Sequence, residues 1–583
     1  MKYQVLKLIQ QAIKALAAEN AGTIDVSARP EVERSRDPQH GHYASNIAMR
    51  LAKSLGQPPR QVAASIIEKL PESSLVESVK IAGPGFINFR LSSQAFHREL
   101  CSIIDRGNQY GKSDLGGGHK VLLEYVSAKP PGPLHVGHGR HADSGVSVAL
   151  LLKATGYEVL TEYYVNDAGR QMDILTLSVW LRMLEDASAE ITFPSGAYRG
   201  EYVREIAAAT TKLLDPSFAA IPNELFRSLP GDKRDSDAHL DHLIEQARIA
   251  LGEEGFLAIL NTALHSILAD IQEDLAEFRV CPNEWFSERS LDDRQSIQKT
   301  LKLLKKNGMT YERDGAVWFR ATNFGDEKDR VVVRDNGRTT YFASDIAYHL
   351  HKRERGFETL IDVLGADHHG YVTRVRAGLE AMGEPPESLE VQLVQFVVLY
   401  RGGKKVQMST RSGDFITLRQ LRNEVGNDAA RLFFVLRSNE QHLDFDLDLA
   451  KARSNENPVY YIQYANARVC SVLRELDARG YTWDSNMERC SLDRLTEEPE
   501  QALMQQLTRF PETLDAASRQ RAPQYVAHYL RELAHNFHVY YNAHQFIVDD
   551  EALRNARLML VLATQQVLQN GLILLGVDAP ESM

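Results

Sequence analysis

The chain has 583 residues, of which 43% are hydrophobic and 25% are charged, and its formal net charge at pH 7 is −11. This length and composition indicate a globular protein of about three to five domains, each large enough to bury a core. A protein that relied on sequence-independent binding to nucleic acid would usually be basic overall, so the charge argues against that class. Any RNA contact must therefore use local basic patches.

The cysteines and the apolar stretches exclude further classes. Cys101, Cys281, Cys470 and Cys490 form no C-x-x-C pair, which argues against structural zinc and against a disulfide framework. The amphipathic N-terminus lacks the apolar core of a signal peptide. The most apolar stretch, 558–577, is interrupted by amide side chains and is too polar to span a membrane. We therefore expect a cytoplasmic protein without a membrane segment.

Residues 1–110 predict a small α+β domain. Apolar residues at helical spacing predict a helix over 3–18. The stretch 76–91 predicts two strands around a turn at 82–85, because glycine and proline separate two strand-like runs. The glycine-rich segment 111–118 is typical of a linker.

Residues 111–427 show the rhythm of a doubly wound, Rossmann-like α/β domain. The apolar run 121–126 predicts a buried strand, and 138–154 predicts the helix that follows it. A mostly helical, charged stretch at 183–265 predicts an insertion. Further strands are predicted at 158–165, 330–333, 359–364 and 391–399. From 428 to 583 nearly everything is helical in pattern, which predicts an all-α bundle.

The strongest local signal is the segment 133–139, Pro-Leu-His-Val-Gly-His-Gly, where a predicted strand turns into a helix. Free N–H groups at a helix N-terminus favour a bound phosphate, and glycines let a nucleotide approach the backbone. His135 and His138 can lie on one side of this turn and donate hydrogen bonds to charge that develops on phosphates. Alone, the segment could equally be a proline-rich loop with two surface histidines. A zinc site is disfavoured, because no third ligand is evident nearby.

A second signal is the segment 406–414, Val-Gln-Met-Ser-Thr-Arg-Ser-Gly-Asp, after the run 391–399 and a basic turn at 401–405. Open α/β sheets bind ligands beyond the carboxyl ends of their strands, so a mobile loop here could close over a triphosphate. Taken alone, the segment is more typical of a solvated hairpin.

In this order the two segments resemble the signatures of the class I aminoacyl-tRNA synthetases, H-x-G-H after the first strand and K-M-S-K-S after the last. Segments 124–128 (Glu-Tyr-Val-Ser-Ala), 162–169 (Glu-Tyr-Tyr-Val-Asn-Asp-Ala-Gly) and 341–349 (Tyr-Phe-Ala-Ser-Asp-Ile-Ala-Tyr-His) resemble the arginine enzymes of that class. The likeness continues through 365–371 and covers nearly the whole chain.

The resemblance implies a multidomain α/β enzyme with a Rossmann-like catalytic domain. It would activate L-arginine with ATP and Mg²⁺, with tRNA(Arg) already bound, and transfer the arginyl group to the terminal ribose of the tRNA. It implies no metal site and no structural zinc, and we expect a monomer. The implied catalytic residues are His135, His138, Ser409 and Arg411, and we expect Lys129 to act with them. The implied ATP contacts are Pro133, Leu134, Gly137, Gly139, Gly365, Asp367, His368 and Met408.

The chemistry of arginine agrees with this resemblance. A guanidinium is a flat cation with five donors, and carboxylates bind it best. Asp345 and Tyr341 are four residues apart on a predicted helix and share a face, and Glu124 ends the first strand. We expect these three to bind the guanidinium, with Ser127 and His369 completing the arginine site. Without the resemblance, Tyr341 and Asp345 would be an ordinary helix start.

The sequence departs from the family pattern at two positions. Position 410 is threonine where K-M-S-K-S has its second lysine, so a cation that would stabilise the leaving pyrophosphate is missing. Position 129 is lysine where many arginine enzymes carry asparagine. We hypothesise that Lys129, six residues before His135, supplies the missing charge; the alternative is that it is merely solvated. Rival sources of charge are Arg411, Lys404 and Lys405.

The C-terminal part resembles the D-A-L-R anticodon-binding domain through 428–432 (Asp-Ala-Ala-Arg-Leu) and 457–468. Exposed aromatics beside basic residues can stack on unpaired bases, although aromatics at helical spacing more often pack in a core. The N-terminal domain resembles the one with which arginine enzymes meet the tRNA elbow, with His42 where an aspartate is common. The predicted tRNA contacts are Asn46, Tyr461, Tyr464, Arg468 and Tyr541.

Two other functions stay open at this point. A class I-like ligase or nucleotidyltransferase could use the histidine signature without tRNA, although both flanking domains argue against it. A catalytically silent relative could bind RNA or act as a scaffold, and Thr410 is the best support for that alternative.

Overall fold

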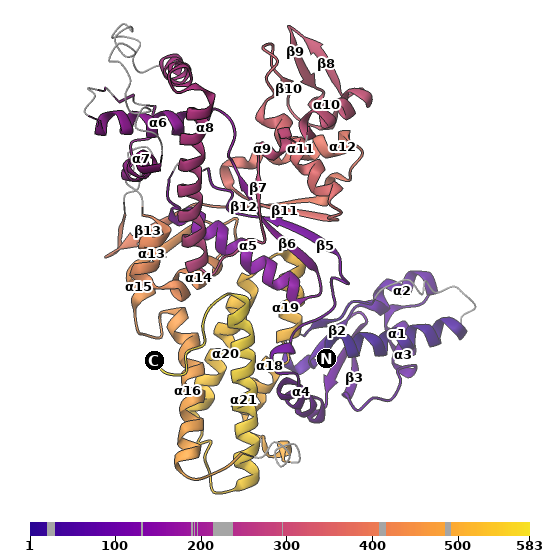
Figure 1. Ribbon diagram of the computed structural model, residues 1–583. Helices are drawn as coiled ribbons and strands as arrows, with labels where there is room; N and C mark the ends of the chain where they lie inside the picture. Colours follow the sequence, from indigo (N-terminus) through magenta and orange to yellow (C-terminus); the bar gives the residue numbers. More distant parts are fainter. Residues whose placement is uncertain are drawn as a thin grey trace.

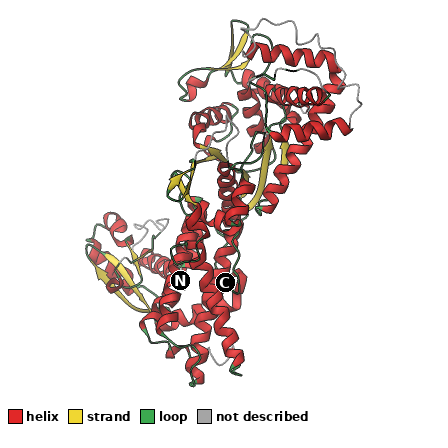
Figure 2. Ribbon diagram, turned by 90° about the vertical axis from the view of Figure 1, so that its left-hand side faces the viewer, coloured by secondary structure: helices red, strands yellow, loops and turns green. Residues whose placement is uncertain are grey.

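The structure, a computed structural model, describes residues 1–19, 30–35, 37–129, 132–187, 191, 193–194, 196–213, 237–293, 295–406, 416–483 and 491–583, with the backbone alone at 38, 213, 293 and 369. The molecule is elongated (Figure 1). An α/β body lies at one end, a long helical bundle at the other, and the N-terminal domain lies against the side of the bundle; the view turned by 90° shows the same arrangement (Figure 2). The multidomain α/β fold class is confirmed.

The N-terminal domain is an antiparallel sheet of order β1-β2-β4-β3 covered by helices. The helix predicted over 3–18 is confirmed, and its buried face of Val5, Ile9, Ile13 and Leu16 follows the helical period. The two strands predicted at 76–91 are also confirmed. The elements are α1 (Lys2–Glu19), β1 (Glu33–Arg34), β2 (Tyr43–Ser45), α2 (Ile47–Leu55), α3 (Pro59–Glu68), β3 (Val76–Ala82), β4 (Phe86–Leu91) and α4 (Ser93–Arg106), with 3₁₀ turns η1 (Pro38–His40) and η2 (Gly107–Gln109).

The body is built on a five-stranded parallel sheet of order β12-β11-β5-β6-β7. Successive side chains of a strand point to opposite faces, so Val121 and Leu123 pack in the core that includes α5, and Leu122 packs in the core that includes α11 and α12. The elements are β5 (Lys120–Glu124), α5 (Val136–Ala154), β6 (Glu158–Val165), β7 (Glu284–Ser287), α11 (Tyr341–Glu354), β11 (Thr359–Gly365), α12 (His369–Ala381) and β12 (Leu389–Val394), with 3₁₀ turns η6 (Ala366–His368) and η7 (Pro386–Ser388).

Two strand predictions need correction. The strand at 330–333 exists, but it belongs to a separate antiparallel sheet of order β10-β9-β8. The single strand predicted over 391–399 is wrong, because β12 ends at Val394 and β13 begins a third sheet of order β14-β13-β15. The chain changes sheets at Gln395, whose N–H donates to the carbonyl of Asn439 (2.8 Å) and whose carbonyl accepts from Arg140 (2.8 Å). The elements are α9 (Arg289–Asp293), α10 (Ser296–Lys306), β8 (Thr310–Arg313), β9 (Ala316–Phe319), η5 (Ala321–Phe324), β10 (Arg330–Val333), β13 (Val397–Arg401), β14 (Lys404–Lys405) and β15 (Leu443–Asp446).

The described part of 183–265 is largely helical, as the charged helical pattern predicts. The helices here are α6 (Arg170–Asp186), α7 (Glu201–Leu213) and α8 (Asp237–Glu277), and α8 is interrupted at Gly252, where φ is +66°. They stand together on the body beside β6 and β7 (Figure 1). The insertion therefore lies on the side of the sheet where those strands end.

The C-terminal part is a helical bundle in which α16, α18, α20 and α21 pack on one another. The apolar stretch 558–577 falls in α21 and its C-terminal turn, and most of its side chains are buried by the bundle. Among the described residues, no helix is both long and apolar enough to cross a membrane. The elements are α13 (Leu418–Val425), α14 (Asn427–Val435), α15 (Leu447–Lys451), α16 (Pro458–Ala478), η8 (Leu492–Arg494), α18 (Glu498–Leu507), α19 (Phe510–Gln520), α20 (Gln524–Ala543) and α21 (Glu551–Leu574).

Ion pairs hold the three parts together. A strand of the N-terminal domain and a strand of the body each pair with the α19 region, and the signature helix α5 pairs with α14. The α5–α14 pair is fully buried, so it fixes the position of α5. The pairs are Arg34 with Glu512 (2.9 Å), Arg521 with Glu390 (3.0 Å) and Asp143 with Arg431 (3.1 Å).

Candidate active site

The turn before α5 is built by its two histidines. His135 is the N-cap of α5, and its Nδ1 accepts hydrogen bonds from the N–H groups of Gly137 (3.1 Å) and His138 (3.3 Å). The Nδ1 of His138 accepts in turn from the N–H of His135 at 3.3 Å. Because each Nδ1 is an acceptor, each neutral ring carries its proton on Nε2. The turn therefore fixes the tautomer that presents two Nε2–H donors.

Burial keeps both rings in that neutral form. The rings stack with their centroids 3.7 Å apart. Burial lowers the pKa of His135, and burial together with the neighbouring His135 and His141 holds the pKa of His138 well below its usual value. At neutral pH the pair is thus a fixed set of uncharged donors, which suits the oxygens of a polyphosphate.

A third histidine, His141, lies one turn further along α5 and was missed by the sequence analysis. Burial, and the nearby His135 and Arg140, lower its pKa to about 4. Its ring is next to Gly365, because a Cβ on that glycine would lie 3.7 Å from His141 Cε1. The spacing of 135, 138 and 141 was the available signal, since residues three apart share a helix face.

The residues predicted to hold the ATP ribose lie at the carboxyl end of β11, beside α5. Gly365 ends the strand, and a Cβ there would lie 2.5 Å from Asp367 Oδ1, so a larger residue would displace that carboxylate from its present position. Asp367 and His368 form the following 3₁₀ turn and are exposed, with His368 Nε2 3.8 Å from Asp367 Oδ2. This is the edge of a parallel sheet at which nucleotides bind.

The reason given for Gly139 needs correction. A Cβ at this position would lie 2.7 Å from Leu418 Cδ1 and 3.2 Å from the ring of Phe434, so the missing side chain makes room for α13 and α14 and not for a nucleotide. At Gly137 a Cβ would meet the ring of His135 at 2.9 Å. Both glycines therefore serve the construction of the turn, and the adjoining Leu134 is buried.

The second signature lies outside the described residues, and with it the predictions for Met408, Ser409, Thr410 and Arg411. The chain that follows it is fixed beside the histidine turn. Val136 donates its N–H to the carbonyl of Ile416 (3.3 Å), and Leu418 donates to the carbonyl of Leu134 (2.8 Å). The residues that directly follow the second signature are therefore adjacent to the histidine turn.

The predicted arginine site begins at a strained turn after β5. Val126 and Ser127 have φ values of +69° and +39°, which are rare for residues with a Cβ. The turn is held in place, because Ser127 Oγ donates to Glu124 Oε1 (2.8 Å) and accepts from the N–H of Tyr164 (3.1 Å). Such strain is typical of functional sites, and here it carries Glu124 and Ser127 into one pocket.

Tyr341 and Asp345 lie on one face at the start of α11, as their spacing predicts. Tyr341 is exposed, and its hydroxyl reaches the turn at Gly169, where a Cβ would lie 3.1 Å from the oxygen. Burial and the nearby carboxylates of Glu124 and Asp362 raise the pKa of Asp345 to about 7. A carboxyl with that pKa lacks enough positive charge around it, which a bound cation would supply.

Glu288, after β7, is a further acidic residue that the sequence analysis missed. It is buried, and burial together with Asp345 and Asp167 raises its pKa to about 7. The same carboxylates contribute to the raised pKa of Tyr164, whose largest cause is burial. The pocket is therefore more acidic than the predicted residues alone make it. Among the described residues, no group of three or more His, Cys, Asp or Glu side chains is arranged to hold a metal ion.

Two predicted residues stand at the limits of the described chain. Lys129 is exposed and directly precedes 130–131, which are outside the described residues. His369 begins α12, and its side chain is outside the described residues.

The predicted RNA-binding residues of the bundle gather on adjoining faces of α16 and α20. The guanidinium of Arg468 lies between two rings, 4.6 Å from the centroid of Tyr464 and 4.5 Å from that of Tyr541. Tyr461 packs on His538 with centroids 4.6 Å apart. All four predicted residues are partly exposed. Three neighbouring aromatics are instead core residues: Phe537, Tyr540 and Phe546.

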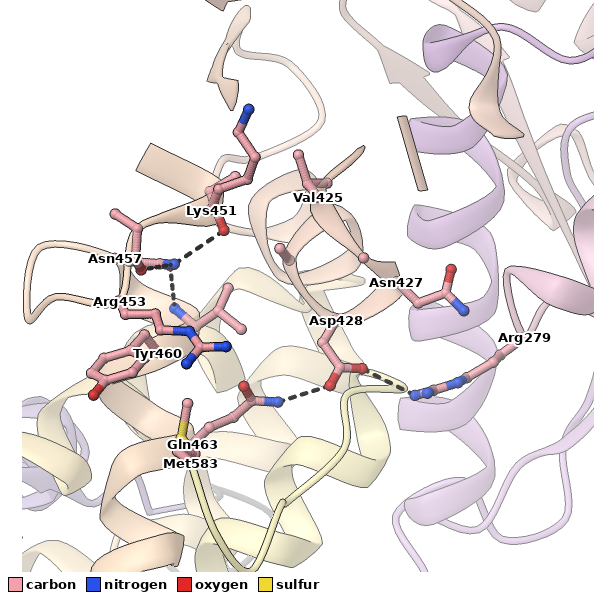
Figure 3. Close-up of a pocket in the computed structure, with 15 residues that line it drawn as sticks. Arg279, Val425, Asn427, Asp428, Lys451, Arg453, Asn457, Tyr460, Gln463 and Met583 are labelled. Atoms are coloured by element: carbon pink, nitrogen blue, oxygen red, sulfur yellow. Dashed lines mark hydrogen bonds and ion pairs between the residues drawn. The ribbon is translucent and has the colours of Figure 1, made fainter. Parts of the chain in front are cut away.

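A cavity of about 430 Å³ lies where α14, α15, α16 and the C-terminus meet (Figure 3). Asp428, the first residue of the D-A-A-R segment, organises its floor by accepting from Gln463 (2.8 Å) and from Arg279 of the turn after α8 (3.1 Å). The rim carries Arg453 and Tyr460. Asp428 and the buried Arg431 therefore join domains, and neither is free for an anticodon.

In the N-terminal domain, Asn46 is the N-cap of α2 but makes no side-chain cap, and its amide oxygen is buried without a partner. His42 is structural, because its Nδ1 accepts from the N–H of Leu91 (2.9 Å) and its ring packs on Phe96. An aspartate is therefore not required at that position for the local fold.

Comparison with known proteins agrees with this arrangement. Three family models match the chain: the arginyl tRNA synthetase N-terminal domain at residues 4–91, the class I (R) tRNA synthetase catalytic domain at 99–205 and 248–453, and the DALR anticodon binding domain at 462–583.

Full-length relatives match as well. The arginine–tRNA ligase of Thioalkalivibrio sulfidiphilus is 54% identical over the whole of both chains, and that of Hydrogenovibrio crunogenus is 53% identical, again over both whole chains. The solved arginyl-tRNA synthetase of Thermus thermophilus has the same fold over the whole of both chains, with a TM-score of 0.74 at 24% identity. With these matches over its entire length, the chain belongs to the arginyl-tRNA synthetase family.

Proposed function

We propose that this protein is an arginine–tRNA ligase, which activates L-arginine with ATP and transfers it to the terminal ribose of tRNA(Arg). One observation carries the proposal. An acidic pocket formed by Glu124, Asp345 and Glu288 lies on the sheet beside a turn that presents two neutral histidine donors, and burial and neighbouring carboxylates raise the pKa values of Asp345 and Glu288 to about 7. The pocket suits a guanidinium, and the turn suits a triphosphate.

The reaction follows from this placement. The arginine carboxylate attacks the α-phosphorus of ATP, the bond from that phosphorus to the bridging oxygen breaks, and pyrophosphate leaves. The Nε2–H groups of His135 and His138 donate to the phosphate oxygens on which charge builds up. Mg²⁺ would arrive with ATP and would neutralise part of the charge of its phosphates. Gly365, Asp367 and His368 hold the ribose, and Glu124, Tyr341 and Asp345 hold the guanidinium.

ATP–pyrophosphate exchange with each amino acid, with and without total tRNA, tests the function. We expect exchange with arginine alone, and only when tRNA is present. Exchange with arginine in the absence of tRNA would support arginine as the substrate but would contradict the expected dependence on tRNA. If the folded protein bound tRNA but showed no ATP–pyrophosphate exchange with any amino acid, it would be a catalytically silent relative.

The tRNA would contact two separate surfaces. One is the face of α16 and α20 that carries Tyr461, Tyr464, Arg468 and Tyr541, where rings and a guanidinium can stack on unpaired bases. The other is the N-terminal domain around Asn46, whose amide oxygen lacks a partner. We further propose that the protein works as a monomer in the cytoplasm, which light scattering during gel filtration and cell fractionation would test.

Lys129 is expected to supply the charge that Thr410 lacks. The Lys129→Ala variant should lose at least about tenfold in the single-turnover rate of adenylate formation, because one cation at the leaving group is removed. Its affinity for arginine should change little. The double variant Lys129→Asn with Thr410→Lys should recover the rate. Lys120→Ala, an exposed lysine at the other end of β5, is the matched control. An unchanged rate in Lys129→Ala would show that Lys129 is only solvated.

The KM for arginine is expected to depend on pH. Burial and neighbouring carboxylates raise the pKa values of Asp345 and Glu288 to about 7, so below pH 7 both are largely protonated and cannot bind a cation. The KM should therefore fall about tenfold or more from pH 6 to pH 8, since a group of pKa about 7 becomes about tenfold more ionised over that range. The signature histidines, whose pKa values are lowered, stay neutral throughout. A KM that is flat over this range would contradict the assignment.

A further inference from the structure

Two buried cations lie directly behind the proposed guanidinium site. His349 and Lys352 are on the inner face of α11, one and two turns after Asp345, and their exposed fractions are 1% and 0%. Cations buried to this extent occur only with partners, because the cost of desolvation is large. Their partners are the carboxylates of the site itself.

His349 donates from both ring nitrogens. Its Nδ1 lies 2.8 Å from the backbone carbonyl of Asp345, and its Nε2 lies 2.7 Å from Asp362 Oδ2. A carbonyl oxygen can only accept, and the carboxylate of Asp362 is ionised: although burial would raise its pKa, Lys352 and His349 lower it well below the usual value. Two acceptors require two N–H groups, so a ring with a proton on each nitrogen satisfies this geometry fully. It ties the backbone of Asp345 to β11.

Lys352 joins the same aspartate to the arginine site. Its Nζ donates to Asp362 Oδ1 at 2.9 Å and to Glu124 Oε2 at 2.6 Å, and it lies 4.3 Å from the ring centroid of Tyr348. The other oxygen of Glu124 accepts from Ser127. Both oxygens of Glu124 are therefore held before any substrate arrives, which is the preorganisation that a specific site needs.

The charges of the pocket divide into two groups. His349 and Lys352 pair with Asp362 and Glu124, whereas the described residues provide no buried ion pair for Asp345 or Glu288. The titratable groups that face Asp345 come from every element around it: Glu124 of β5, Tyr164 of β6, Glu288 after β7, Asp362 of β11, His349 and Lys352 of α11, and Tyr371 of α12. The unbalanced charge is thus confined to the side of the pocket that Tyr341 borders.

We infer that His349, Asp362 and Lys352 form a buried network of ion pairs, here called the relay. Its function is to position Glu124 and Asp345 and to set the negative charge that the pocket offers to a guanidinium. The inference rests on the proposed function, since it names what determines recognition of arginine in that site. All three are positioning residues, because they act through Glu124 and Asp345.

Single replacements on the two sides of the relay should shift the pH dependence of the KM for arginine in opposite directions. Asp362→Asn removes a negative charge but leaves an acceptor for His349, so the pKa of Asp345 falls and the midpoint of the KM profile moves to lower pH. Lys352→Gln removes a positive charge that lowers that pKa, so the midpoint moves to higher pH. A residue that only supported folding would leave the midpoint unchanged.

The double variant Lys352→Gln with Asp362→Asn separates position from charge. It removes one positive and one negative charge, so the net charge around Asp345 is that of the parent. The midpoint of the pH profile of the KM for arginine should therefore return close to the parent value. The KM for arginine should nevertheless stay raised by about tenfold or more at pH 8, because Glu124 has lost its buried partner, while kcat at saturating arginine and the KM for ATP change by less than about twofold. The matched control is Glu500→Gln with Arg557→Gln, which removes a buried pair of 2.9 Å within the bundle. Its arginine KM should equal that of the parent.

The measurement is tRNA-dependent ATP–pyrophosphate exchange from pH 6 to pH 9, on variants whose folding is checked by thermal unfolding. Folded variants with the parent midpoint and the parent KM would overturn the relay. Asp362→Asn, which is nearly isosteric, decides the question by itself if Lys352→Gln does not fold. If the parent protein showed no arginine-dependent ATP–pyrophosphate exchange, the proposed function itself would be overturned. The two failures are therefore distinguishable.

Discussion

Replacing Asp345 by asparagine is expected to abolish arginine activation and, at the same time, to stabilise the unliganded protein. Breaking a buried pair of a guanidinium and a carboxylate costs about 3–5 kcal/mol, so kcat/KM for arginine should fall by on the order of a hundredfold to several thousandfold. In the unliganded protein the same carboxylate is unfavourable, because burial and nearby carboxylates raise its pKa to about 7.

The sign of the stability effect follows from that shift. The folded protein binds the proton of Asp345 more tightly than the unfolded chain does, so the stability that this group contributes is lost as the pH rises through 7. An asparagine at position 345 does not ionise, so the variant does not lose stability in this way as the pH rises. At pH 8 the Tm of the variant should therefore exceed that of the parent, and the difference should shrink as the pH is lowered to 5, where Asp345 is protonated in the folded protein.

Thermal unfolding and exchange kinetics on one preparation check both effects. The matched control is Asp274→Asn, which changes a buried aspartate that already has arginine partners on α13. That variant should keep the parent KM for arginine. The Asp345→Asn variant could instead be less stable than the parent at pH 8. That result would show that a neighbouring cation stabilises the Asp345 carboxylate, and it would contradict the proposed acidic pocket.

The local parts of this fold could be predicted from the sequence, because local patterns determine them. The helix at 138–154 and the strands at 121–126, 158–165 and 359–364 are confirmed, with ends that differ by at most two residues. The strand at 330–333 was also located, but not its sheet. Strand pairing is a contact between distant segments, and no pattern inside four residues specifies the partner.

The break between β12 and β13 shows the same limit. The run at 391–399 is continuous in its apolar pattern, yet the chain changes sheets at Gln395. The cause is the pairing of Gln395 with Asn439 and Arg140, residues far away in the sequence. Periodicity cannot reveal such a contact, because it depends on where two other segments fold.

The candidate site also contains some residues that could be predicted from the sequence and others that could not. The two histidines and the pair Tyr341 and Asp345 were recognisable from spacing and resemblance. Glu288 was not, because it is a lone acidic residue in an unremarkable segment and only the fold brings it near Asp345. His349 and Lys352 did leave a signal: they continue the polar face of Asp345 along a helix whose other buried residues are mostly apolar. That stripe was visible in the sequence but had no assigned partner until β11 was placed beside it.

The second large effect is expected at His135, where one side chain has two separable roles. Its Nδ1 caps α5 by accepting from two backbone N–H groups, whereas its Nε2–H takes no part in the cap and is proposed to donate to ATP. Serine is a good N-cap but has no donor at the position of Nε2, whereas alanine has neither function. The two variants therefore separate the structural role from the chemical one.

His135→Ser should fold with nearly the stability of the parent, and His135→Ala should be about 1 kcal/mol less stable, because it loses the cap. Both should lose about 10²- to 10³-fold in kcat for ATP–pyrophosphate exchange, the typical effect of removing one preorganised donor to developing charge. The KM for arginine should change little, since the guanidinium pocket is built from β5, β7 and α11. If His135→Ser kept the parent kcat while His135→Ala lost it, the histidine would act only as a cap, and the donors to the phosphates would have to be sought in His138, Lys129 and the loop 407–415.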